Sequence, residues 1–569
     1  MKVSYTVSFD HYFDYEELTQ ILHELSAQYP QLMKVSSICK SQEGREVWAV
    51  EITNLATGDF LEKPAYYIDG NHHAGEVTGS MASMHTIVEL VSKYGTDEAI
   101  TALLDNTTVY VIPRVSPDGA ETYLKTAEKL RSVNRPYPFL DRAPGLHAKD
   151  MDGDGVIRMM RVKSPYGTWK ESADDPRLMV KRAPDDVAGT YYNIYTEGDI
   201  EDYDGLNIQL ATNKWELDFN RNYPYGWFPE VRQPGAGPYP LSNPENKALV
   251  DFVLSHPNIG SVDTMHTTGG VIVYPPGTKP EAEAEKRDMA MYRAVGAMAT
   301  QELGYDCVNI FDEFLADSKN YSSGAYDDWL YQTQGIPAYT VELWDLQIRA
   351  GVEGVWPRNA SHEKTDAQKE RDYAKIIAWV DEHVGKDAFQ PWTKLQHPQL
   401  GEVEIGGLDF KFTMQNCPPA YLQQEVEKTT RYCLRHAAVL PHLSIDAMTV
   451  QKQANGIYVV QAVVGNRGYL PTFLTQEALN MKVDQPLQAV LAVPEGAEVI
   501  MGQQSGQIGH LEGIAGIPSS YGYDFITTGK HDPLCKKLQW VIKGAPGQTV
   551  VLCVAGAKAG KAQAHVVLP

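Results

Sequence analysis

The stretch Tyr66-Tyr-Ile-Asp-Gly-Asn-His-His-Ala-Gly-Glu76 decides the fold. Its apolar start predicts a short buried strand, and the glycine after it predicts a turn. Beyond Glu76, apolar residues recur at steps of four and three, which is the spacing of an amphipathic helix: Val77, Met81, Met84, Val88 and Val91. His73 and Glu76 are therefore expected between a strand end and a helix, where loops often carry chemistry on a rigid base.

A histidine and a glutamate separated by two residues form a candidate metal site. Zinc accepts an imidazole nitrogen and a carboxylate oxygen, and a catalytic zinc keeps one position open for water. His73 and Glu76 alone are also compatible with ordinary polar residues in the first turn of a helix. The rest of the chain has to decide between these two interpretations.

Length and charge restrict the remaining possibilities. The 569 residues are too many for one compact core and indicate two or three domains. With a net charge of −23 and no basic stripe, nucleic acid and anionic membranes are poor partners. No apolar run reaches the roughly 18 residues that suggest a membrane span.

The N-terminus and the cysteines indicate the compartment. The first residues contain no apolar secretory segment, although a signal removed from a longer precursor would leave no trace here. The six cysteines are scattered, which favours free thiols in a reducing compartment over disulfides or a thiolate zinc site. We therefore expect a cytoplasmic protein.

Strand-like and helix-like runs alternate through the first two thirds of the chain. This alternation indicates an α/β sheet covered on both faces, an α/β/α domain over residues 1–386. A polar stretch rich in Pro and Gly at about 135–217 interrupts it. Because a structureless loop of that length is improbable, we expect an ordered insertion on one face of the domain.

The texture of the sequence changes after the α/β region. Pro391, Pro398 and Gly401 indicate a linker at 387–400. Short β-like runs separated by Gly and Pro follow. They predict a smaller, mainly β, sandwich-like domain over residues 401–569.

Three predicted strand ends carry residues suited to one site. His73 and Glu76 follow the strand at 65–69, His266 closes the strand at 261–265, and Glu342 closes the strand at 338–341. In an open α/β sheet, ligands bind outside the carboxyl ends of the strands, so these side chains are expected to converge. Two His and one Glu make a three-ligand zinc set, and a further carboxylate nearby can serve as general base.

At this point the chain resembles the carboxypeptidase A-like family of zinc metallocarboxypeptidases, the funnelins, over about residues 10–385. The family's His-x-x-Glu pair matches His73 and Glu76, and its distant histidine matches His266 in Thr-Met-His-Thr-Thr-Gly-Gly. The two-residue gap to Glu76 selects His73 over His72. The resemblance implies a mixed-sheet α/β/α domain that binds one catalytic Zn²⁺.

Further family motifs follow in the expected order. The family's Asn-Pro-Asp-Gly turn appears as Ser116-Pro-Asp-Gly119, with Ser in place of Asn. Its Asn-Arg-Asn motif lies within Asp218-Phe-Asn-Arg-Asn-Tyr223. Its late-strand glutamate matches Glu342 in Tyr-Thr-Val-Glu-Leu-Trp. Each motif is modest alone, and together they make the resemblance strong.

The resemblance implies a role for each matched residue. Glu342 would act as general base, and Asn220 and Arg221 would bind the C-terminal carboxylate of the substrate. A further arginine would stabilise the oxyanion, with Arg131 at the family-like spacing and Arg135 as its rival.

The family's closing tyrosine and side-chain pocket are matched less clearly. Tyr321 stands one residue closer than usual to the Ser-Gly motif, and Tyr326 is the alternative. Asp327 matches the base of the side-chain pocket, where an acid favours basic C-terminal residues. Adjacent Asp328 would then be the structural member of that pair of acids.

The insertion contains a second candidate ion site. Asp150, Asp152 and Asp154, followed by Gly155, stand at the spacing of a calcium loop, but the twelfth position is Arg161 rather than Glu. The alternative is a turn whose side chains bind their own backbone.

Together these observations predict a zinc metallocarboxypeptidase that acts on peptides or peptide-like substrates with a free C-terminal carboxylate. One alternative is a related amidohydrolase acting on acyl-amino acids or cell-wall peptides. The other is a binding module that keeps the fold without catalysis.

Overall fold

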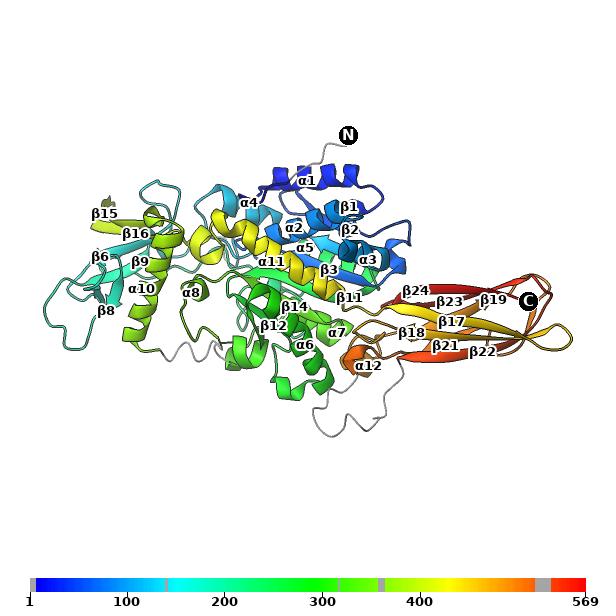
Figure 1. Cartoon of the computed structure of the whole chain (residues 1–569). Helices are drawn as coiled ribbons and strands as arrows, with labels where there is room; N and C mark the ends of the chain where they lie inside the picture. Colours follow the sequence, from blue (N-terminus) through cyan, green and yellow to red (C-terminus); the bar gives the residue numbers. More distant parts are fainter. Residues whose placement is uncertain (1–6, 139–141, 316–317, 357–363, 517–533) are drawn as a thin grey trace.

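The computed structural model describes residues 7–138, 142–315, 318–356, 364–516 and 534–569. Figure 1 shows a central body with a sheet between helices. A β lobe lies at one side of this body and a β sandwich at the other, on the left and right of the view.

The sheet of the central body is mixed, as the resemblance implies. Its strands pair in the order β1-β2-β4-β3-β11-β14-β12-β13. The middle pairs, from β4 through β14, are parallel, whereas β1, β2 and the β12–β14 pair are antiparallel. The strands are β1 (Met33–Lys40), β2 (Glu46–Ile52), β3 (Ala65–Gly70), β4 (Thr108–Ile112), β11 (Ile259–Thr267), β12 (Val271–Tyr274), β13 (Asp306–Asn309) and β14 (Ala338–Leu343).

Helices cover both faces of this sheet. Successive side chains of a strand point to opposite faces. On β3, Tyr66 packs against His436 of α11 (Pro419–Ala437), whereas Tyr67 packs against Phe252 of α5 (Pro244–Ser255). α2 and α6 contact α11 and lie on the same face of the sheet as α11. The other helices of the body are α1 (Tyr15–Gln28), α2 (Val77–Lys93), α3 (Glu98–Asn106), α4 (Pro117–Lys125), α6 (Lys286–Leu303), α7 (Tyr326–Gln334), α8 (Leu346–Arg349) and α10 (Asp366–His383).

The strand, turn and helix predicted from the opening stretch are confirmed. β3 is buried at every residue because it lies between β4 and β11 beneath helices on both faces. α2 begins at Val77, and Glu76 is its N-cap residue. His73 therefore lies in the short loop between them.

The described residues of the insertion predicted at about 135–217 form β-strands, as expected of an ordered insertion, and contribute most of the lobe. The strands of the lobe pair in the order β15-β16-β6-β9-β7-β8, and β10 pairs with β5 in a separate two-stranded sheet. The strands are β5 (Gly145–Ala148), β6 (Met159–Lys163), β7 (Trp169–Glu171), β8 (Met179–Lys181), β9 (Tyr192–Thr196), β10 (Gly198–Glu201), β15 (Phe389–His397) and β16 (Gly401–Leu408).

The linker predicted at 387–400 is wrong. Residues 389–397 form β15, which pairs with β16, and β16 pairs in turn with β6 of the insertion. Pro391 is compatible with this strand because β15 lies at the edge of the sheet and its register shifts between Gln390 and Thr393. The proline that indicated a linker therefore occupies an irregular edge strand.

The boundary predicted at residue 401 is also wrong. β16 belongs to the lobe, and the apolar face of α11 is buried in the core of the central body. The sandwich starts at Leu443, and its mainly β character is as predicted. Its two sheets, β17-β18-β22-β20 and β21-β19-β23-β24, enclose a core of their own. The elements are β17 (Leu443–Lys452), β18 (Ile457–Asn466), α12 (Gln476–Met481), β19 (Leu487–Ala492), β20 (Glu498–Met501), β21 (Ser505–Gly509), β22 (Cys535–Lys543), β23 (Thr549–Gly556) and β24 (Gly560–Val567).

Hydrogen bonds attach the sandwich to the central body. The Asp288 carboxylate of α6 accepts hydrogen bonds from the backbone N–H groups of Gln476 and Glu477, at the start of α12. Lys558 Nζ donates to the carbonyl oxygen of Ile259 at 2.7 Å. Of the helices in the described ranges, none has the length and apolar character needed to cross a membrane.

Candidate metal centre

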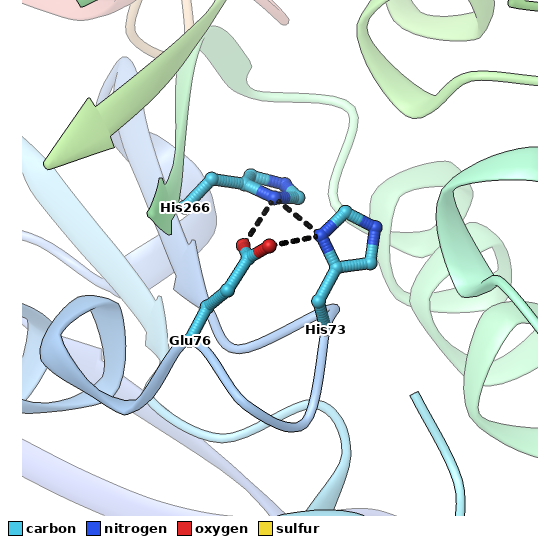
Figure 2. Close-up of side chains that lie close together, drawn as sticks. All are labelled: His73, Glu76 and His266. Atoms are coloured by element: carbon cyan, nitrogen blue, oxygen red, sulfur yellow. Dashed lines mark hydrogen bonds and ion pairs between the residues drawn. The ribbon is translucent and has the colours of Figure 1, made fainter. Parts of the chain in front are cut away.

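Three side chains predicted as metal ligands meet at the carboxyl ends of β3 and β11. Figure 2 shows His73, Glu76 and His266 pointing toward one another. His73 Nδ1 lies 2.8 Å from Glu76 Oε1, and His266 Nδ1 lies 2.9 Å from Glu76 Oε2. The two Nδ1 atoms are 3.0 Å apart. Each of the three residues is at most 4% exposed, so their side chains are buried.

This donor set fits a zinc ion. With bonds of about 2.0–2.1 Å, tetrahedral zinc ligands lie about 3.3 Å from one another, close to the separations found here. His73 Nε2 lies 3.0 Å from Asp218 Oδ1. Because a carboxylate accepts, this bond puts the ring proton on Nε2 and leaves Nδ1 as the ligand atom.

The cluster is also held electrostatically. Burial alone would raise the pKa of the Glu76 carboxyl, but the rings of His73 and His266 hold that pKa below its usual range. Glu76 Oε2 further accepts a hydrogen bond from the backbone N–H of Thr267, at 3.1 Å. The glutamate therefore stays ionised, the form that binds metal.

Asp218 is the functional residue that sequence reasoning left without a role. Besides His73, its carboxylate accepts from Arg131 Nε at 2.8 Å and from the backbone N–H of Asn220 at 2.8 Å. Burial would raise the pKa of the Asp218 carboxyl, but Arg131 and His73 hold it well below its usual range. An acid two residues before the Asn-Arg pair was the signal in the sequence, but only the fold reveals its partners.

Glu342 lies beside the ligand cluster. In the parallel β11–β14 pair its Cα is registered with that of His266, so both residues stand at the same height of the sheet. Its charge acts on the guanidinium groups of Arg131 and Arg221. Despite burial, the nearby carboxylates, Asp218 first, raise the pKa of Arg131, whereas burial lowers the pKa of Arg221. The Glu342 carboxylate and the two guanidinium groups thus lie near one another.

Asn220 and Arg221 come to the site on a short helical turn, Phe219–Arg221. The turn begins at Asp218, whose carboxylate also holds His73. Asn220 Oδ1 accepts from the backbone N–H of Tyr326 at 2.8 Å, which leaves its amide N–H groups as donors. The predicted pair is therefore tied to both the ligand loop and the start of α7.

The structure separates the two arginines predicted as alternatives. Arg131 reaches the cluster, with Nη1 3.5 Å from Glu76 Oε1 as well as its bond to Asp218. Arg135 instead donates to Asn243 Oδ1 at 2.6 Å and to Gln42 Oε1 at 3.1 Å, away from the ligands. Arg131 is thus the arginine with the position that its predicted role requires.

The tyrosines separate in the same way. Tyr326 is fully buried, and its ring stacks with Tyr223 at 4.6 Å and Trp329 at 5.8 Å. A ring packed in the core in this way does not suit the role of the closing tyrosine. Tyr321 is half-buried, and its hydroxyl accepts from Arg232 Nη2 at 3.3 Å. Its closing role stays a prediction.

Asp327 and Asp328 are buried at the start of α7. Asp327 Oδ2 accepts from Thr340 Oγ1 at 2.8 Å, and its charge acts on Arg221. Asp328 accepts from the backbone N–H of Gly277. Burial, together with Asp327, raises the pKa of the Asp328 carboxyl to about 7. Recognition of a basic side chain by Asp327 stays a prediction.

The acidic loop of the lobe does not gather all three predicted calcium ligands. Asp150 and Asp152 lie near Glu197, whereas Asp154 forms an ion pair with Arg158. Asp150 accepts from the backbone N–H groups of Gly153 and Gly155, and Asp154 from that of Val156. These bonds match the alternative given for the loop, a turn whose side chains bind their own backbone.

Comparisons with known proteins agree with the geometry. A family model described as zinc carboxypeptidase matches residues 18–143 and 203–368, on either side of the insertion. A second model, described as a domain of unknown function, matches residues 442–567, which is the sandwich.

Individual relatives are distant. Carboxypeptidase A2 of Rattus norvegicus is 23% identical over 350 residues, which is 59% of this chain and 64% of that protein. Human carboxypeptidase D is 30% identical over 111 residues, 20% of this chain and 8% of that protein. The chain thus spans less than two thirds of the length of these curated relatives.

Among solved structures, the carboxypeptidase A of Helicoverpa armigera is 18% identical, with a TM-score of 0.39, over 67% of this chain and 77% of that one. The match to the zinc carboxypeptidase model covers just over half of the chain and contains every predicted zinc ligand as well as Asn220, Arg221 and Glu342. The chain belongs to the zinc carboxypeptidase family.

Proposed function

We propose that this protein is a zinc-dependent metallocarboxypeptidase that hydrolyses the C-terminal peptide bond of peptides or peptide-like substrates. The observation that carries the proposal is the convergence of two sets of side chains. The ligand cluster of His73, Glu76 and His266 is joined through Asp218 to the segment of Asn220 and Arg221. A metal set next to a carboxylate-binding pair suits an exopeptidase.

The proposed roles of the residues follow from their chemistry. His73, Glu76 and His266 would hold zinc, which when bound supplies the Lewis acidity that acidifies a water and polarises a carbonyl. Glu342 accepts the proton of the attacking water and returns it to the leaving amine. Its registry with His266 supports this role.

The cations bind the two negative groups of the reaction. Arg221, with its planar set of donors, and the Asn220 amide bind the free carboxylate of the substrate. Arg131 stabilises the negative charge that develops on the carbonyl oxygen. Its link to Asp218 and its nearness to Glu76 support this assignment. Tyr321 would close over the bound substrate, and Asp327 would favour a basic terminal side chain.

The first test measures zinc content and the cleavage of the peptide bond in a blocked dipeptide and in its C-terminal amide. We expect one zinc per chain and hydrolysis of the acid in strong preference to the amide. A chain without zinc would overturn the enzyme interpretation. Zinc without amino-acid release would overturn the carboxypeptidase and favour an amidohydrolase.

A matched pair of variants tests the oxyanion role. Arg131→Ala should lower kcat/KM by about 10²–10³, the usual effect of losing an oxyanion donor. Arg135→Ala removes the same type of side chain from a position that contacts Gln42 and Asn243. It should change kcat/KM by less than about twofold. Equal losses in the two variants would contradict the assignment of Arg131.

A further inference from the structure

A buried hydrogen-bond chain lies directly beneath the metal cluster. It runs from Asp69, the next-to-last residue of β3, through Thr264 and His72 to the hydroxyl of Tyr223. Asp69 Oδ1 is 3.1 Å from His72 Nδ1, and His72 Nε2 is 2.8 Å from the Tyr223 hydroxyl oxygen. Asp69, His72 and Tyr223 are 0% exposed. Because the hydroxyl of Thr264 donates to Asp69, it accepts from His72 Nδ1, and Nε2 of the ring therefore accepts from Tyr223.

The lower end of the chain is anchored in the sheet. Thr264 Oγ1 of β11 donates to Asp69 Oδ1 at 2.6 Å and lies 3.3 Å from His72 Nδ1. The His72 ring also stacks on the ring of His266, with centroids 5.6 Å apart and an interplanar angle of 18°. His72 thus contacts β3, which leads to the ligand His73, and β11, which contains the ligand His266.

The upper end of the chain reaches the carboxylate-binding segment. Tyr223 is two residues after Arg221, and its backbone N–H donates to the carbonyl oxygen of Gly324 at 3.0 Å. Asn220 is held by the backbone of Tyr326, whose ring packs on that of Tyr223. A hydrogen bond to Tyr223 therefore acts on the short segment that presents both Asn220 and Arg221.

We propose that His72 is a positioning residue that sets the distance between the metal cluster and the segment of Asn220 and Arg221. His72 precedes the ligand His73, and the two adjacent histidines bind opposite ends of that segment, at Tyr223 and Asp218. An apolar side chain would fill this buried space without the desolvation cost of an imidazole. The polar chain instead adds a directed link between parts of the sequence 151 residues apart.

This inference rests on the proposed exopeptidase function, because it concerns the distance from the metal to the substrate carboxylate. Tyr223→Phe tests it with little disturbance, since the ring and its packing stay while the hydroxyl is lost. The measurement is calorimetric binding of a blocked dipeptide and of its C-terminal amide to zinc-loaded protein. It is made in a Glu342→Gln background, so that the peptide is not cleaved.

The parent should bind the acid more tightly than the amide. Tyr223→Phe should weaken binding of the acid about fivefold, roughly the effect of one hydrogen bond, and leave zinc content and amide binding unchanged. His72→Phe, which removes both hydrogen bonds of the ring, should change acid binding in the same direction. Because this second variant is the more disruptive, its folding is checked by thermal unfolding.

Tyr432→Phe is the matched control. Tyr432 is also a fully buried tyrosine whose hydroxyl contacts a histidine, and it bonds to an aspartate as well, but it lies on α11. It should leave the binding of both ligands unchanged. Acid binding within twofold of the parent in Tyr223→Phe, equal weakening of acid and amide, or the same loss in Tyr432→Phe would overturn the role of His72. A parent that binds acid and amide equally would overturn the inference by removing the proposed function itself.

Discussion

Two buried networks, each with an aspartate, a histidine and a tyrosine, lie on opposite faces of the central sheet and connect different elements. Asp69, His72 and Tyr223 form one, and the other consists of Asp263, His436 and Tyr432. In the second, the Asp263 carboxylate is 2.8 Å from His436 Nδ1 and 3.1 Å from the Tyr432 hydroxyl. The first joins two loops of the candidate site, whereas the second fastens helix α11 to β11.

The difference comes from position along the strand rather than from residue type. Asp69 is at the end of β3, where the chain turns into the ligand loop. Asp263 is in the middle of β11. The His436 ring that contacts it through Nδ1 also lies, through Nε2, 2.7 Å from Ser261 Oγ of the same strand. Asp263 and His266 are three residues apart and point to opposite faces of the sheet. The α11 network can therefore contribute to stability without touching the metal cluster.

The largest effect on stability is expected on the α11 side. His436→Leu leaves the buried Asp263 carboxylate without its histidine hydrogen bond, so the free energy of unfolding should fall by about 2–3 kcal/mol. Zinc content and kcat/KM of the folded protein should stay near those of the parent. Denaturant unfolding measures the free energy of unfolding, and metal analysis measures the zinc content. An unchanged free energy of unfolding would show that this network does not fasten the helix.

An intermediate effect is expected for the aspartate on the site side. Asp218→Asn removes the charge that orients His73 and holds Arg131, which should weaken zinc binding about 10–100-fold. Competition with a coloured chelator measures that affinity. Asp263→Asn is the matched control with its carboxylate on the other face, and it should bind zinc as the parent does. Equal zinc affinities in the two variants would remove the distinction drawn between the networks.

The smallest effect sharpens the comparison between the two tyrosines. Tyr432→Phe removes one buried hydroxyl from the α11 network and should cost about 1 kcal/mol of stability. Thermal unfolding measures that loss, with preference for acid over amide substrates as the second reading. A change in substrate preference without a change in stability would mean that the two networks had been assigned the wrong way round.

Much of the site could be predicted because local sequence specifies it. The spacing of His73 and Glu76 fixes both on one loop, and the residues at the ends of predicted strands converge once the strands are parallel neighbours. That reasoning extends to His266 and Glu342. It does not reach Asp218, whose importance depends on bonds to residues 87 and 145 positions away.

The lobe could not be predicted for the same physical reason. Residues 401–408 pair with residues 159–163 in one sheet. The two strands are more than 200 residues apart along the chain, and such a pairing leaves no local signal in the sequence. Pro391 and Gly401 indicated a break because an edge strand with an irregular register tolerates the same residues as a linker. The packing of helix α11 on the central body could not be predicted either, because it depends on contacts with the distant helices α2 and α6.

The most direct test of the site as a metal-assisted hydrolase is the Glu342→Gln variant of the full chain. It keeps the shape of the side chain and removes its capacity to accept a proton. Zinc content should stay at one per chain, while release of the C-terminal amino acid from a blocked dipeptide should fall by about 10²–10⁴. Turnover close to that of the parent, with zinc retained, would contradict the assignment of Glu342 as the general base.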